Sequence, residues 1–69
     1  MNKELEQILH KYTKHFIVNT NQLIVSCESI FIMLALITKL KEIGYVRDTS
    51  VPIKVLKSTG VCGTKFIKA

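Results

Sequence analysis

Two cysteines and two histidines are the residues of this 69-residue sequence best suited to do chemistry. Cys27 or Cys62 beside His10 or His15 would give a thiolate–imidazole pair, the arrangement that activates a cysteine nucleophile. Any chain with these residue types offers such a pair, and no catalytic signature surrounds either cysteine. A chain of this length also has little room for a substrate pocket of several hundred cubic ångströms. We therefore expect no enzymatic activity.

The same residue types do not suggest a metal or cofactor site. His10 and His15 stand five positions apart, which does not place them well on one helix face, and neither cysteine has a CxxC companion. Zinc needs four convergent ligands, so no metal and no cofactor is expected. Gly60 and Gly63 have the GxxG spacing of loops that clamp a nucleic-acid backbone, but they fall in a predicted hairpin rather than between helices. A turn glycine and a bulge glycine explain this spacing better.

Positive charge is the clearest indication of a partner, because the chain carries a net charge of +5. The charges of residues 1–38 cancel, so the excess lies in the C-terminal part. Such an asymmetry predicts a face for an anionic partner, either nucleic acid or an acidic protein surface. The alternative is that the lysines only keep an apolar chain soluble. The residues predicted to contact a partner or its phosphates are Arg47, Lys54, Lys57, Lys65 and Lys68.

The first element that must position these residues is a short amphipathic helix over residues 3–18, with Asn2 as its expected N-cap. One apolar stripe at helical spacing supports it: Leu5, Ile8, Leu9, Tyr12 and Phe16. The polar residues at 19–21 then predict a turn.

Residues 21–43 are predicted to form a second, longer and strongly apolar helix that ends at Gly44. No polar residue stands between Ile30 and Ile37, so this helix is expected to be buried on all sides, in part by a second copy of the chain. Its apolar stretch is shorter than the roughly 20 residues of a membrane span and contains Glu28, so a membrane location is not expected. The expected core or oligomer seam is Leu23, Cys27, Ile30, Leu34 and Ile37.

Residues 45–69 are predicted to form a β-hairpin or small antiparallel sheet, with a turn at Gly60, a bulge at Gly63 and the last strand at a sheet edge. Two helices followed by this β-structure make a single α+β domain over residues 1–69.

Two functions remain open at this level. A small chain that is 48% hydrophobic does not hide all of its apolar surface alone, which predicts a homodimer that binds a larger protein through its basic C-terminal hairpin or a sheet edge. Small regulators and viral-type inhibitors often work by occupying a surface on a larger protein, and by this analogy alone a viral or mobile-element protein is one interpretation of the chain. No signal peptide is evident, so the cytoplasm, or the host cytoplasm for a viral protein, is the expected compartment. The alternative is a nucleic-acid-binding regulator of winged-helix or β-ribbon type, whose C-terminal lysines contact phosphates.

Overall fold

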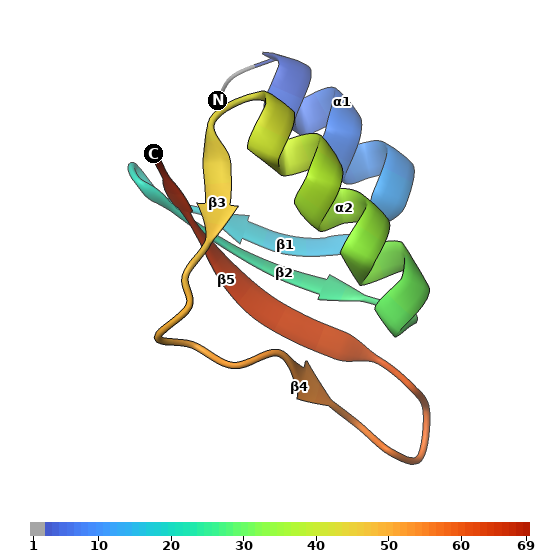
Figure 1. Ribbon diagram of the computed structural model, residues 1–69. Helices are drawn as coiled ribbons and strands as arrows, with labels where there is room; N and C mark the ends of the chain where they lie inside the picture. The colour runs from blue at the N-terminus through green and yellow to red at the C-terminus, as the bar shows by residue number, and fades with distance from the viewer. Residues whose placement is uncertain (1–2) are drawn as a thin grey trace.

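Two helices lie side by side on one face of an antiparallel sheet in the computed structural model, which describes residues 3–69 (Figure 1). This arrangement confirms the predicted α+β class. The predicted N-cap, Asn2, lies outside the described residues. The elements in chain order are α1 (Lys3–Tyr12), β1 (His15–Val18), β2 (Gln22–Cys27), α2 (Ile30–Glu42), β3 (Tyr45–Arg47), β4 (Lys54–Val55) and β5 (Cys62–Lys68).

The C-terminal strand β5 is the centre of the sheet. The strand order is β1-β2-β5-β3, and β4 pairs with the first half of β5 on the same side as β3. The prediction that the last strand lies at an edge is therefore wrong. It failed because β2, predicted to be helical, pairs with β5 over the length of both strands.

The first helix ends at Tyr12, so the prediction of a helix over residues 3–18 is wrong in its last third. The hydroxyl of Thr13 donates a hydrogen bond to the carbonyl of Ser26 on β2, which holds the chain against the sheet directly after the helix. Residues 15–18 then continue as a strand. Aromatic and β-branched side chains favour this conformation, and the hairpin with β2 outweighs one more turn of apolar helical spacing.

The predicted long apolar helix over residues 21–43 is not present, because its first part is the strand β2. Side chains of β2 alternate between buried and exposed positions, the period of two that a strand imposes. A separation of four residues, as between Leu23 and Cys27, fits a helix face and a strand face equally well. This ambiguity led to the wrong prediction.

The second helix begins where Ser29 caps it, since the Ser29 hydroxyl accepts the N–H of Ile32 at 3.3 Å. It ends as predicted at Gly44, whose φ of +89° is a conformation that glycine adopts without strain. Phe31 is 80% exposed and Leu34 53% exposed, so the prediction that this helix is buried on all sides is also wrong. Its core-facing residues are Met33, Leu36 and Leu40.

One core fills the space between the helices and the sheet. Its residues are Leu5, Leu9, Leu23, Val25, Cys27, Met33, Leu36, Leu40, Tyr45, Cys62 and Phe66. The predicted β-structure over residues 45–69 is present as β3, β4 and β5, and Gly60 has a φ of +79° in the turn before β5. Gly63 marks no bulge, because it keeps regular register with Ser26 and with Lys54.

Candidate interaction surface

The sheet face turned away from the helices carries four neighbouring aliphatic side chains, Ile17, Ile24, Ile67 and Val46, which we call the aliphatic band. Ile17 stands directly opposite Ile24, and Ile67 directly opposite Val46, while Ile24 and Ile67 are diagonal neighbours on β2 and β5. The exposed fractions of the three isoleucines are 59%, 45% and 37% in the order given, and Val46 is partly buried. No segment within residues 3–69 covers this band.

The band arises because β2 is apolar on both of its faces. Leu23 and Val25 point under the helices, and Ile24 between them must point the other way. An antiparallel strand with one solvated face normally alternates apolar and polar residues, whereas an apolar run is typical of a strand covered on both faces. The Leu-Ile-Val run is thus the sequence signal for this surface. It indicates an exposed apolar face only once residues 22–27 are known to form a strand.

Beside the band lies an ion pair between Lys65 Nζ and Asp48 Oδ2, which are 3.8 Å apart. Two hydrogen bonds from Ser50 to the Asp48 carboxylate, from the hydroxyl at 2.6 Å and from the N–H at 3.0 Å, hold the pKa of Asp48 below its ordinary value. Lys65 and Arg47 lower the pKa further, and desolvation opposes them. Lys65 borders the band, since it stands opposite Ile24. The carboxylate of Asp48 balances its positive charge there.

The predicted contact residues are divided between the two faces of the sheet. Lys65 lies on the uncovered face because it stands opposite Ile24 of the band. Lys54 lies on the same face because it stands opposite Gly63, two positions before Lys65 on β5. Arg47 and Lys68 stand opposite core residues and so belong to the helix-covered side, where Arg47 donates to a backbone carbonyl at 2.9 Å. Lys57 lies in the turn before β5. The four that lie on strands are thus divided two and two between the faces, and the structure does not gather the five side chains into one basic face.

The predicted seam residues are likewise separated. Leu23 and Cys27 are buried in β2, where the two helices already cover them. Ile30, Leu34 and Ile37 lie on α2, but Leu34 is largely in solvent while the other two pack partly against the core. These residues do not form one continuous stripe, and none of them belongs to the aliphatic band.

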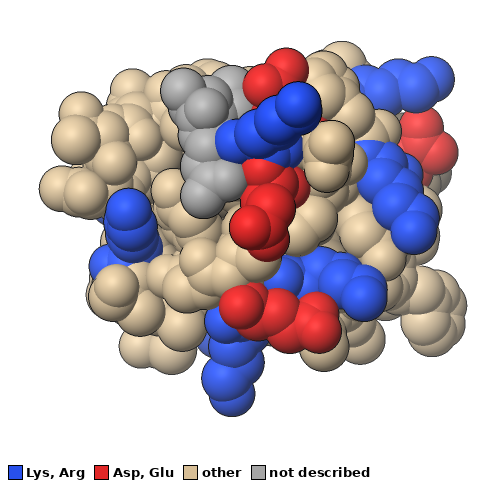
Figure 2. Space-filling view, turned by 90° about the horizontal axis from the view of Figure 1, so that it is seen from above, with Lys and Arg blue, Asp and Glu red and all other residues tan. Residues whose placement is uncertain are grey.

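The helical side of the molecule carries both signs of charge. Figure 2, which looks down on the helices, shows basic and acidic side chains interspersed over this surface. One exposed ion pair contributes, Lys39 with Glu42 at 3.7 Å, and the imidazole of His10 lies 3.6 Å from the carboxylate of Glu6. This mixture gives an anionic partner no single-signed surface on the helices.

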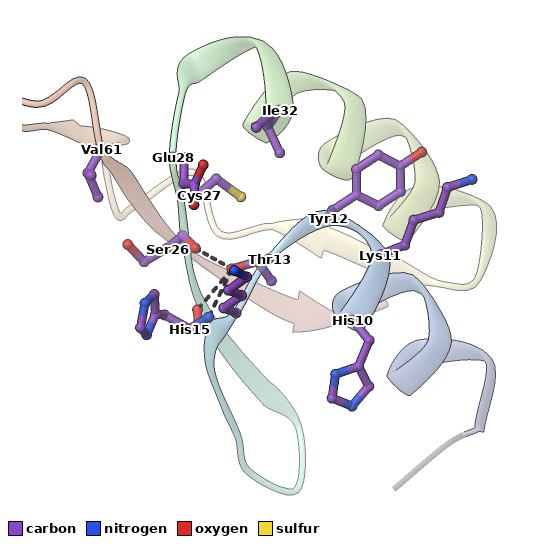
Figure 3. Close-up of a pocket in the computed structure, with 11 residues that line it drawn as sticks. His10, Lys11, Tyr12, Thr13, His15, Ser26, Cys27, Glu28, Ile32 and Val61 are labelled. Carbon is purple, nitrogen blue, oxygen red and sulfur yellow. Dashed lines mark hydrogen bonds between the residues drawn. The ribbon is translucent and has the colours of Figure 1, made fainter.

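A cavity of about 500 Å³ lies where the end of α1, the start of β1, the end of β2 and the start of α2 meet, so the expectation that a chain of this length has little room for a pocket of this size is wrong. Thr13 stands at its centre, where its hydroxyl donates to the Ser26 carbonyl and accepts the N–H of His15 at 3.1 Å (Figure 3). The imidazoles of His10 and His15 lie on opposite sides of Thr13, and the Cys27 thiol lies on a third side.

The two cysteines, distant in the sequence, are direct neighbours in the fold. Cys27 on β2 stands opposite Cys62 on β5, and both are free thiols buried in the core. Burial, and to a smaller extent the proximity of Cys62, raises the pKa of Cys27, which keeps this thiol protonated and poorly nucleophilic.

Within residues 3–69, no three His, Cys, Asp or Glu side chains converge in a way that could hold a metal ion. No helix in that range combines the length and apolarity needed to cross a bilayer. Comparison of the chain with protein-family models, with curated proteins and with solved structures found no match.

Proposed function

We propose that this chain is a non-enzymatic interaction protein that binds a larger protein through the uncovered face of its sheet. The aliphatic band is the observation that supports this function, because a contiguous exposed apolar patch on a small soluble protein typically marks an interaction site. Each isoleucine of the band is about half exposed, so covering it contributes roughly 1 kcal/mol. The band supplies the apolar centre of an interface whose rim is polar.

The charges around the band favour a partner with an apolar centre and an acidic rim. Lys54 lies on the same face as the band, while the charge of Lys65 is already balanced by Asp48. The net charge of +5 attracts an acidic surface over a longer range and raises the association rate.

A nucleic-acid-binding regulator remains the alternative, and it depends on the predicted cationic residues. The distribution of these residues over both faces supports it less well than a single basic face would. Few aromatic rings are available for stacking on bases, and the uncovered face presents aliphatic side chains instead.

The test is affinity capture from cells that express the protein, using two matched variants. Ile24→Lys places a charge inside the band, whereas Leu34→Lys places the same charge on the solvent side of α2, at a residue of similar exposure. We expect the captured protein to be retained by the wild type and by Leu34→Lys and to be lost with Ile24→Lys. Equal capture by both variants would refute the use of this face.

A second experiment separates the alternative. Fluorescence anisotropy with random-sequence duplex DNA and with RNA, over a salt series, measures binding to phosphates directly. We expect no binding near physiological salt. Binding whose log affinity falls linearly with log salt, and which weakens when Lys54, Lys57, Lys65 and Lys68 are changed to Ser, would favour the nucleic-acid function instead.

A further inference from the structure

The strand β1 ends the sheet with backbone groups that point outward. The N–H of Asn19 donates to the carbonyl of Gln22, directly opposite, at 2.9 Å, which fixes the phase of the hairpin ladder. Because hydrogen-bonded and non-bonded pairs alternate along antiparallel strands, Ile17 also bonds to β2. The N–H and carbonyl groups of Phe16 and Val18 therefore point to the free edge, where no strand within residues 3–69 pairs with them.

This edge lacks the protection that the opposite edge has. The far side of β5 is shared by two short strands, β3 and β4, and the chain between them contains Pro52. Short strands, lysines and proline are the usual means of preventing strand addition at an edge. β1 presents His-Phe-Ile-Val, four residues with no lysine and no proline. Of the two sides of the sheet, only the β1 edge offers a regular template for another strand.

We propose that a second copy of the chain adds to this edge, with the two β1 strands antiparallel about a two-fold axis at Ile17. In this register Phe16 faces the partner subunit's Val18, and Val18 faces the partner subunit's Phe16. Each facing pair exchanges two backbone hydrogen bonds, so the outward groups of both copies are satisfied. The same patch on both subunits meets itself, as a two-fold dimer requires.

Side chains and charges fit this register. Ile17 meets Ile17 of the partner subunit in a closely spaced non-bonded pair, with Cα atoms about 4.5 Å apart. The pair lies on the uncovered face, so the aliphatic bands of the two copies join across the dimer axis. Lys14 precedes β1, so the two copies of this residue lie at opposite ends of the paired strands, whereas parallel pairing would set them side by side.

The dimer uses the edge of the sheet, whereas the larger protein partner of the proposed function uses its uncovered face. A failure of the dimer therefore leaves the proposed function standing, and loss of partner capture leaves the dimer standing. The homodimer predicted from the sequence thus forms at a strand edge in this proposal, and not through the apolar helix.

Sedimentation velocity over a concentration series tests the dimer. The wild type is expected to sediment with twice the monomer mass. Ile17→Lys and Ile17→Glu each place like charges opposite one another at the axis, and each is expected to weaken self-association by roughly tenfold or more. Mixed in equal amounts, the two variants are expected to form a heterodimer, because residue 17 of one copy then faces its opposite charge.

A second pair of variants tests the backbone directly. Val18→Pro removes an outward N–H that bonds to no strand of the same chain, and we expect it to be a folded monomer. Val18→Ala keeps the N–H and is expected to remain a dimer. Circular dichroism reports the fold of each variant. A monomeric wild type at high concentration, or no heterodimer from the mixed Ile17 variants, would overturn the proposal. So would a dimer that Leu34→Lys alone dissociates, since that result places the interface on α2.

Discussion

Leu34 on α2 gives the sharpest test of how the structure assigns its core. The apolar spacing of the sequence predicts a buried seam there, whereas the structure leaves 53% of this side chain exposed. Leu36, two positions on, is fully buried. We therefore predict that Leu34→Lys yields a folded protein of nearly wild-type stability, and that Leu36→Ala is far more damaging although it introduces no charge.

The expected magnitudes follow from the two burial states. Complete burial of a leucine stabilises a fold by about 1.5–3 kcal/mol, so a half-exposed leucine contributes ~1 kcal/mol. Lysine has nearly the helix propensity of leucine, and its aliphatic stem covers part of the same surface, so Leu34→Lys should cost less than ~1 kcal/mol. Leu36→Ala removes buried methyl groups and leaves a cavity, which typically costs about 2–5 kcal/mol. A chain of this size has roughly 3–10 kcal/mol in total.

Urea denaturation followed by circular dichroism measures both free energies of unfolding. With the slope of about 1 kcal/mol per molar expected for a small protein, Leu34→Lys should lower the midpoint by less than ~1 M and Leu36→Ala by ~2 M or more. If Leu34→Lys destabilises as much as Leu36→Ala, or dissociates an oligomer, the solvent side of α2 is an interface. The assignment of exposed and core faces on this helix would then be wrong.

Three further predictions concern single groups. The hydroxyl of Thr64 is buried with no hydrogen-bond partner among residues 3–69. Thr64→Val keeps the side-chain shape and should therefore raise the free energy of unfolding by ~1 kcal/mol. A lower urea midpoint for this variant would show that the hydroxyl has a hydrogen-bond partner. Ser29→Ala removes the cap of α2 and should lower the free energy of unfolding by ~1 kcal/mol, whereas Ser29→Asp keeps a capping side chain and should lose little of this stability. Equal urea midpoints for the wild type and Ser29→Ala would contradict the capping role of Ser29. The pKa of Cys27 is raised in the folded state, so above about pH 8.5 the unfolded chain loses this proton first and stability should fall as pH rises. Denaturation at several pH values should show a shallower decline for Cys27→Ala, and identical pH profiles would exclude this thiol as the cause.

Several features of the fold could be predicted from the sequence because their causes are local. The α+β class follows from an N-terminal helical stripe and a C-terminal part rich in β-branched residues and turns. Leu5 and Leu9 of that stripe are indeed buried. Gly44 ends α2 and Gly60 closes the turn before β5, because a positive φ favours glycine whatever the surrounding structure.

The tertiary structure alone decided which apolar residues face inward. Leu23 and Cys27 fit a helix stripe and a strand face equally well, and the pairing of β2 with β5, distant in the sequence, selects the strand. That pairing also places Cys27 opposite Cys62 and turns Ile24 away from the helices. A side chain joins the core or a surface according to what covers its face of the sheet. Coverage is a property of the assembled layers, so the aliphatic band, and with it the candidate site, emerges only when the chain is folded.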